Sequence, residues 1–451
     1  MTDPSEHRSQ ATIMSAISAV ENEAPGGAEA LYMAAMLADS PLPYDFALSI
    51  DGTAHNPSLI NPAAAFFAAT ATIDPLVTRD LIVVDADSQI FQLKEDVRTT
   101  LRNAMDDAQA REWASRALYA MNLVLPDAEP QHWNTVQWLM PHIEVCRALV
   151  TELDVNTAAA NRVLHQTGFS LYHQERYQDA IGFLEAAMAV DVAFKGEQHP
   201  DIVADMEGLG TVHWAAGDLT RAEQTFAACL ELQKTIFTED NPATAPVLNS
   251  LAVVRQGLGD YSGAEATFEE CLRILRLAHD DAHPAIASCL SNMALLYEAM
   301  DRLDEALELA RKSLGINRAL FGDMHPDVAE DCTTVALLLD RLGDSAGAEE
   351  HFRASLHIRE QVFGSQHPET AQALCNLALL LASGERRDEA FDYYDKGLAA
   401  YESALGPNHP LMESALDNFI ALLETVVATP GSDAFRERAE ARLQQIVERG
   451  G

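Results

Sequence analysis

Six prolines stand 42 residues apart along the C-terminal two-thirds of the chain. They are Pro200, Pro242, Pro284, Pro326, Pro368 and Pro410. Histidine precedes five of them, and asparagine precedes Pro242. Proline fits the first turn of a helix, because the N–H that it lacks has no partner there, and it disfavours helical backbone in the residue before it. Each of the six sites is therefore predicted to begin a helix.

Three further series of small or apolar residues keep the same interval of 42. The first is Ala180, Ala222, Ala264, Ala306, Ala348 and Ala390. The second, called the anchor series below, is Gly168, Gly210, Ala252, Ala294, Ala336 and Ala378. The third is Met188, Leu230, Leu272, Leu314, Leu356 and Leu398. Small residues at fixed positions allow two helices to approach closely, so each unit is predicted to contain a pair of packed helices.

Glycines separate the predicted helices. Gly-Asp pairs such as Gly217-Asp218 mark a short turn inside a unit, and Gly322, Gly364 and Gly406 precede the next His-Pro, where they predict left-handed C-caps. One helical hairpin cannot bury its apolar face alone, whereas hairpins stacked in register build a continuous core. The fold class is therefore predicted as mainly α, with an α-solenoid of about seven helical hairpins over residues 158–427.

The best-matched units carry a recognisable motif. The stretches are His283-Pro284 with Asn292-Met293-Ala294, His367-Pro368 with Asn376-Leu377-Ala378, and the second-helix starts Asp304-Glu305-Ala306 and Asp388-Glu389-Ala390. They resemble the 42-residue tetratricopeptide repeat (TPR) of kinesin light chains and of many bacterial regulatory proteins. The resemblance covers about residues 157–427. It implies a right-handed superhelix whose first helices line a concave groove that binds other proteins.

Residues 13–110 do not follow the repeat. Helices are predicted at 11–21 and 28–37, and another begins over 44–48 after a break at Pro41-Leu42-Pro43. Apolar runs at 81–84 and 90–93 flank polar turn residues and predict a β-hairpin. Three helices followed by a hairpin favour a winged-helix fold.

This order resembles the winged-helix segment of STAND-type (NB-ARC-like) ATPases that carry TPR sensors. In that family a histidine after the hairpin contacts nucleotide, but Lys94 stands at the matching place here. The chain has no GxxxxGK[ST] sequence, so the phosphate-binding loop of the family is missing. The chain is expected to be either a relative without the ATPase domain or a fragment of a longer protein, and its start at Met1 favours the first.

The predicted domains follow from these boundaries. They are a leader at 1–12, a winged-helix-like domain at 13–110, a helical bridge at 111–157, the TPR array at 158–427 and a C-terminal capping helix at 428–451, which Ser432 and Asp433 are expected to cap.

The formal net charge of −39 is spread along the chain. Binding to phosphate backbones or anionic membranes needs a basic surface, so nucleic acid and membrane are excluded as partners. The six cysteines show no zinc spacing and are expected to be free thiols in a reducing compartment. The N-terminus lacks the pattern of a signal peptide. We therefore expect a cytoplasmic protein, of an oligomeric state that the sequence does not give.

Candidate groove residues come from one face of the predicted first helices. Two places before the anchor series stand Gln166, Gly208, Ser250, Asn292, Thr334, Asn376 and Asn418, and all of them except Gly208 carry an amide or a hydroxyl. The family uses asparagine at this place to bond the backbone of an extended peptide, which carries over to Asn292, Asn376 and Asn418. Asn249, Arg341, Tyr172 and Trp214 share the face, and the two aromatics fit either partner binding or packing between hairpins.

The residue directly after the anchor offers an apolar groove floor, although from sequence a floor and an inter-helix core look alike. The positions are Thr211, Val253, Leu295, Leu337, Leu379 and Ala421.

No residues in the chain are grouped as catalysis or metal binding requires. The histidines before the prolines should lie about 10 Å apart in stacked hairpins, too far to share one metal ion, and are expected to bond the helix starts. We therefore predict no enzyme activity and no cofactor or metal. The expected function is a scaffold that binds another protein or peptide, one with basic residues, in the groove. The alternative is a regulatory sensor derived from STAND proteins that acts with a separate ATPase or effector.

Overall fold

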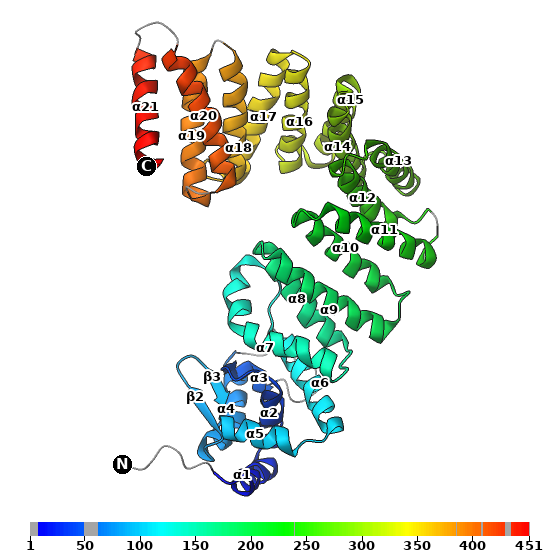
Figure 1. The fold of residues 1–451 in the computed structure, drawn as a ribbon, viewed down its shortest axis with the longest axis vertical. Coiled ribbons are helices and arrows are strands. Elements are labelled where there is room, and N and C mark those ends of the chain that lie inside the picture. The colour runs from blue at the N-terminus through cyan, green and yellow to red at the C-terminus, as the bar shows by residue number, and fades with distance from the viewer. Residues whose placement is uncertain are drawn as a thin grey trace. The chain divides into compact units, whose positions relative to one another are not determined.

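The computed structural model describes residues 8–48, 62–238, 240–384, 386–406, 409–428 and 434–450. It divides into two compact units, Met1–Thr238 and Glu239–Gly451, and each is considered by itself. The division lies inside the predicted repeat array, between the second and third hairpins. Helices dominate both units, in agreement with the predicted fold class (Figure 1).

The N-terminal unit begins with helices and a small sheet. The elements are α1 (Gln10–Glu23), α2 (Pro25–Met36), β1 (Leu42–Pro43), α3 (Tyr44–Leu48), α4 (Pro62–Thr78), β2 (Ile82–Asp85) and β3 (Ile90–Leu93). The strands are antiparallel in the order β1-β3-β2. The predicted hairpin is confirmed, with Ile82 paired to Leu93 and Asp85 to Ile90.

Two elements of this region were not predicted. The prolines around Leu42 were interpreted as a break, but Leu42 and Pro43 form strand β1. A proline fits there because β1 is an edge strand, where a missing N–H removes no bond to a further strand. Helix α4 was also missed, so more than three helices precede the hairpin. It contains Pro75, which weakens a helical pattern in sequence.

Two arginines of α5 (Glu95–Ala104) hold the C-terminal end of α2. The buried Arg98 donates through Nη1 to the carbonyls of Ala34 (3.0 Å) and Leu37 (2.7 Å). Arg102 donates to the carbonyls of Ala35 and Leu37. The last carbonyls of a helix have no partner in their own helix and carry partial negative charge, so two cations there stabilise the helix end.

Two long helices follow, α6 (Asp107–Val124) and α7 (Trp133–Glu152), separated by the 3₁₀ turn Pro130–His132. Trp113 of α6 stacks on Tyr32 of α2, with ring centroids 4.8 Å apart. His142 of α7 is buried and its Nε2 lies 3.0 Å from the carbonyl of Pro41 beside β1. These contacts fix the helical segment against the sheet-containing region.

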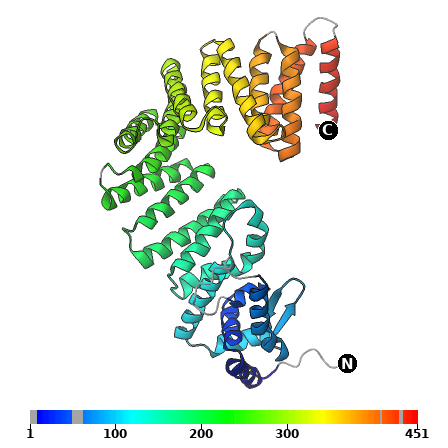
Figure 2. The same ribbon diagram turned by 180° about the vertical axis from the view of Figure 1, so that it is seen from behind.

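The repeats form seven helical hairpins within the described residues, and the seventh includes α21, which was predicted as a separate capping helix outside the array. In the N-terminal unit they are α8 (Ala158–His173) with α9 (Tyr177–Lys195) and α10 (Pro200–Ala215) with α11 (Leu219–Ile236). In the C-terminal unit they are α12 (Ala245–Gly257) with α13 (Tyr261–Ala278), α14 (Pro284–Ala299) with α15 (Leu303–Phe321), α16 (Pro326–Arg341) with α17 (Ser345–Phe363), α18 (Pro368–Ser383) with α19 (Arg387–Leu405), and α20 (Pro410–Ala428) with α21 (Ala434–Gly450). Within the C-terminal unit, consecutive hairpins lie side by side (Figures 1 and 2).

The predicted helix starts are confirmed, with one difference. Five of the six prolines open an α-helix, while Pro242 opens the 3₁₀ turn Pro242–Thr244 ahead of α12. Pro246 explains this turn, because it has no N–H to donate to the carbonyl of Pro242, and the α-helical bond between them cannot form.

The histidine before each proline bonds the helix start, as predicted. In all five cases its Nδ1 accepts the backbone N–H two residues on, at 3.2 Å. Asn241 does the same with Oδ1 at 2.9 Å. Three of the histidines also stack on an aromatic ring four residues earlier, at centroid distances of 3.7–4.7 Å. The five histidines are thus N-caps that join one hairpin to the next.

We expect His325→Ala to destabilise the start of α16 by about 1–2 kcal/mol, because it removes both the N-cap acceptor and the ring stacked on Phe321. His325→Asn is the matched variant, since Asn241 caps the equivalent position. It should retain the cap and lose only the stack. Amide hydrogen exchange across α15 and α16 measures both variants, and wild-type protection in the alanine variant would contradict the assigned role.

The glycines that close three units adopt positive φ, but not the left-handed helical conformation that was predicted. Gly322, Gly364 and Gly406 have φ of 78–86° with ψ of 166–175°. This region of backbone space is essentially restricted to glycine. It turns the chain into an extended segment that leads to the next His-Pro.

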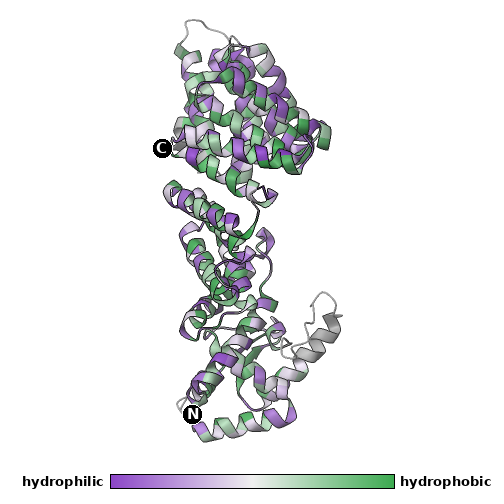
Figure 3. Cartoon of the chain, turned by 90° about the vertical axis from the view of Figure 1, so that its right-hand side faces the viewer, coloured by the Kyte–Doolittle hydropathy of each residue, from purple (hydrophilic) through white to green (hydrophobic). Residues whose placement is uncertain are grey.

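The anchor series lies in the hairpin core. Its alanines Ala252, Ala294, Ala336 and Ala378 are fully buried. The glycines of the series leave no room even for the side chain of alanine. A Cβ on Gly210 would lie 2.7 Å from the ring of Phe226, and a Cβ on Gly168 would lie equally close to the side chain of Leu184. Figure 3 shows hydrophobic and hydrophilic residues interleaved along the repeat helices that face the viewer, as amphipathic packing requires.

The last helix, α21, packs on its own array. Arg442 forms an ion pair with Asp395 of α19 at 2.8 Å, and the ring of Phe435 meets that of Phe391 edge-on. Ser432 and Asp433, predicted to cap this helix, lie outside the described residues.

Candidate functional site

The first helices of the C-terminal unit stand next to one another. Asn292 of α14 donates through Nδ2 to Oδ1 of Asn249 on α12 at 3.1 Å. Arg341 of α16 lies 3.3 Å from a carboxylate oxygen of Glu298 on α14. Contacts also join α18 to α20. Residues at equivalent positions of these helices therefore form rows across the unit.

The predicted amide and hydroxyl positions differ in their exposure. Asn249, Ser250, Asn292 and Asn376 are half-buried, and Asn418 on α20 is exposed. Thr334 is buried, and its hydroxyl donates to the carbonyl of Glu330 in its own helix. Asn292 and Asn249 use part of their bonding capacity on each other, so Asn376 and Asn418 are the better-placed members of the row to reach a ligand.

The leucines directly after three of the anchors are more exposed than Asn292, Thr334 and Asn376. Leu295, Leu337 and Leu379 are 40%, 41% and 51% exposed, while most other leucines of α14, α16 and α18 are buried. These three, named the leucine row here, were weighed from sequence as either groove floor or inter-helix core. Their exposure places them on the open face of the first helices.

Arg341 is exposed but already paired. Its Nη1 and Nη2 reach Glu298 and Asp301 of the preceding hairpin, at 3.3 and 2.8 Å. The predicted site residue therefore links two hairpins, and its charge is offset by two carboxylates.

Tyr172 and Trp214 belong to the N-terminal unit and are considered apart from the rows above. Tyr172 of α8 is half-buried among the rings of Phe169, His173 and Tyr177. Trp214 of α10 is 46% exposed. Tyr172 thus takes part in ring packing, whereas the side chain of Trp214 is exposed.

The N-terminal unit also contains a buried acidic pair that the sequence reading missed. Asp191 of α9 and Asp205 of α10 are nearly inaccessible, and Lys195 lies 2.8 Å from Asp191. Burial, followed by the charge of Asp191, raises the pKa of Asp205 to about 7. His165 lies 4.0 Å from Asp205 but burial lowers its pKa, so it is neutral at neutral pH.

The same repeat position holds a buried acid in the C-terminal unit. Asp331 of α16 accepts hydrogen bonds from Ser313 (2.8 Å) and Asn317 (2.7 Å) of α15. Burial raises its pKa to about 6. Asp205 and Asp331 stand where other repeats have Val247, Cys289 and Ala373, and this exchange of apolar for acidic residues is the sequence signal that could have found them.

Arginines at the start of two second helices bridge hairpins. Arg302 forms ion pairs with Glu305 in its own helix and with Glu265 of the preceding hairpin at 2.7 Å, and Arg386 pairs with Glu349 in the same way. The Arg302 guanidinium lowers the pKa of the Glu265 carboxyl. These pairs lie at equivalent places two repeats apart and are structural links.

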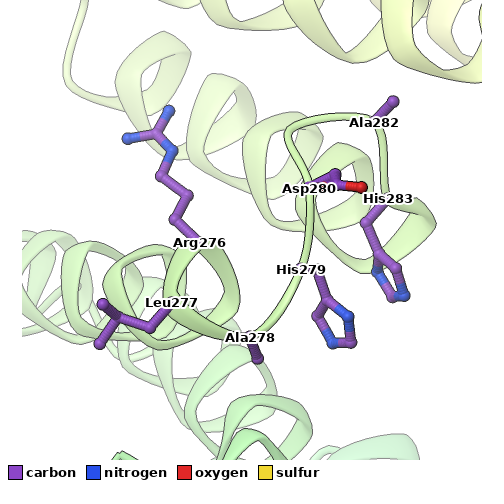
Figure 4. Close-up of a pocket in the computed structure, with 7 residues that line it drawn as sticks. All are labelled: Arg276, Leu277, Ala278, His279, Asp280, Ala282 and His283. Carbon is purple, nitrogen blue, oxygen red and sulfur yellow. The ribbon is translucent and has the colours of Figure 1, made fainter.

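An open cavity beside the α13–α14 loop is lined by two histidines. Figure 4 shows the rings of His279 and His283 next to each other, with Arg276 extending away from them. The rings are nearly parallel at 3.7 Å, so their in-plane lone pairs do not converge, and Nδ1 of His283 already accepts the N–H of Ala285. Among the described residues no group of three or more ligands could hold a metal ion.

All six cysteines are described and are free thiols, as predicted. Burial raises the pKa of Cys146 to about 12, so this thiol stays protonated and serves packing. No helix in the described part of the chain is long and apolar enough to cross a membrane.

Comparison with protein families decides the class. The tetratricopeptide repeat model matches residues 159–235, 203–277, 243–319 and 329–403, which together make up just over half of the chain. The chain belongs to the tetratricopeptide repeat family. TPR proteins bind other proteins or peptides and are generally non-enzymatic scaffolds, and this one is a protein-interaction scaffold by its repeats.

Several solved structures are similar to this TPR chain. TPR-like repeats of a kinesin light chain from Podospora anserina are 20% identical, cover 46% of this chain and 97% of their own, and have a TM-score of 0.41. BtubC from P. vanneervenii is 22% identical over 51% of this chain and 91% of its own, with a TM-score of 0.44. A STAND protein with a TPR sensor from Pyrococcus horikoshii is 12% identical over 94% of this chain and 63% of its own, with a TM-score of 0.46. The search of curated proteins gave no match.

Proposed function

We propose that this TPR protein binds an extended segment of another protein on the open face of α12, α14, α16, α18 and α20. The observation that carries the proposal is the recurrence, on successive first helices, of an exposed leucine close to a polar side chain. Leucine buries apolar area on binding, and a side-chain amide both donates to and accepts from a peptide backbone. The proposed site is Asn249, Ser250, Asn292, Arg341, Asn376 and Asn418 with the leucine row, and Trp214 is a separate contact in the N-terminal unit. Thr334 is left out of it, because its side chain is buried and bonds the carbonyl of Glu330.

The test is a pull-down from native lysate that compares the wild-type chain with the Asn292→Ala/Asn376→Ala variant. A partner held by these amides should be lost with the double variant. Gln361→Ala is the matched control, because Gln361 is an exposed amide of α17, a second helix. A partner retained by the double variant would remove the amides from the site.

A second candidate function is a sensor related to STAND proteins, with a winged-helix domain at residues 13–110. The order α2-β1-α3-α4-β2-β3 and the sheet order β1-β3-β2 support this interpretation. Helix α4 has no lysine or arginine, which argues against nucleic acid as the ligand of this domain. Lys94, at the place of the family histidine, is paired with Asp80. An effector or ATPase protein is therefore the partner in this candidate function.

A variant in the β2–β3 hairpin distinguishes the two candidate functions. Val83 of β2 is 59% exposed, so Val83→Glu changes the surface of the hairpin without opening the core. Under the sensor proposal this variant loses a partner that the Asn292→Ala/Asn376→Ala variant keeps. In either role we place the protein in the cytoplasm, which its free cysteines support.

A further inference from the structure

Each leucine of the row shares its side of the helix with further exposed residues. On α14 the exposed positions Ser288, Leu295 and Ala299 are spaced by seven and four residues, which keeps one side of a helix. The same spacing recurs in Glu330, Leu337 and Arg341 of α16 and in Gln372, Leu379 and Ser383 of α18. Each of these three helices therefore presents one leucine near the middle of its open side.

The spacing of the row follows from helix packing. Neighbouring packed helices lie roughly 8–10 Å apart, so consecutive leucines are separated by about that distance along the direction that crosses the helices. A β-strand places side chains on one face every second residue, about 7 Å apart. Its side chains would therefore no longer coincide with the leucines after one helix. A polyproline II segment has three residues per turn and rises about 3.1 Å per residue, so every third side chain faces the same way about 9 Å further on. The polyproline II geometry matches the row.

The charged residues of the same helices indicate the sign of the charge that a partner should carry. Helices α12, α14, α16, α18 and α20 together carry nine acidic and two basic residues. Of the two arginines, Arg255 donates to the Thr267 hydroxyl and Arg341 is paired with Glu298 and Asp301. These helices are therefore net negative, although Asp331 among them is buried and Glu330 and Glu369 pair with Arg359 of α17. Lysine or arginine in a partner complements the remaining negative charge.

We propose that the leucine row takes a polyproline II segment with an apolar side chain at every third position and with lysine or arginine between them. This inference rests on the proposed scaffold function and specifies its ligand. A polyproline II segment also suits a long open face, because it loses little conformational freedom on binding and leaves its backbone groups free for the flanking amides.

The experiment selects ligands from a phage-displayed library of random 12-residue peptides on the full chain. Peptides are then synthesised and their affinity measured for the wild type, for Leu337→Ser and for the matched control Leu277→Ser, an exposed leucine of α13 outside the row. We expect enriched sequences with net positive charge and apolar residues three apart. Leu337→Ser should weaken their binding about tenfold or more, and Leu277→Ser should not.

Apolar residues two apart would indicate a β-strand, and seven apart an α-helix, and either result overturns the inference. Enrichment without any apolar period, or no enrichment, overturns it as well. The scaffold function is judged separately in the lysate. A native partner that is lost with Asn292→Ala/Asn376→Ala but kept by Leu337→Ser leaves the scaffold function standing and refutes this ligand, whereas a partner kept by both contradicts the two proposals together.

Discussion

Arg98→Met is expected to lower the free energy of unfolding of the N-terminal unit by about 2–4 kcal/mol. Methionine keeps much of the buried length of the side chain but donates no hydrogen bond. The carbonyls of Ala34 and Leu37 at the end of α2 then lose a charged donor inside the protein, where water does not replace it. All four tryptophans of the chain, the last being Trp214, lie in this unit, so urea unfolding followed by tryptophan fluorescence measures it specifically.

Arg102→Met is the control for this experiment. Arg102 bonds the same helix end but is exposed, so water can take over its bonds and the loss should be about 1 kcal/mol. Equal losses for the two variants would mean that burial does not matter to the contact. A wild-type midpoint for Arg98→Met would show that the arginine is not the support of α2.

The repeat array was predictable because one interval governs it. Proline, the small anchor residue and the turn glycine each constrain the backbone or the packing locally, and their recurrence at 42 residues sets every hairpin in register. The departures from this period have local causes, which the 42-residue interval does not reveal. Pro246 converts the start of α12 into a 3₁₀ turn, and β1 is two residues long and contains a proline.

The helix face that carries the candidate site could be predicted from the sequence, but the exposure of the individual residues on that face could not. Sequence spacing places Thr334 and Leu337 on the same side of α16, yet the threonine is 6% and the leucine 41% exposed. The difference arises from the neighbouring helices, which cover Thr334, two places before the anchor, and leave Leu337, one place after it, open. Arg341 was likewise predicted as a groove residue, while its pairing with Asp301 depends on a contact between hairpins.

The buried acid of α10 gives the second large effect. Asp205→Asn is expected to stabilise the N-terminal unit by about 2–4 kcal/mol at pH 8 and by less than half as much at pH 5. The pKa of Asp205 in the folded protein, about 7, is above the ordinary value for an aspartate. The folded state therefore binds the proton of Asp205 more tightly than the unfolded state does. The contribution of Asp205 to the free energy of unfolding is highest below about pH 4, where Asp205 is protonated in both states, and it falls as the pH rises from there toward 7. Asparagine has nearly the same shape and no charge, so it removes this loss.

The sign of the effect is tested by a neighbour on the same helix. Asp201 is exposed and its pKa is lowered, chiefly by its hydrogen bond with Lys195, so Asp201→Asn should be slightly destabilising at pH 8, by less than about 1 kcal/mol. Urea midpoints of the wild type and both variants, followed by tryptophan fluorescence at pH 5, 6.5 and 8, make the comparison. If Asp205→Asn gains nothing at pH 8, the carboxylate is compensated in the folded state, with Lys195 as the cation whose charge acts on it. If the gain appears equally at pH 5, its origin is the packing of the amide and not the titration of Asp205.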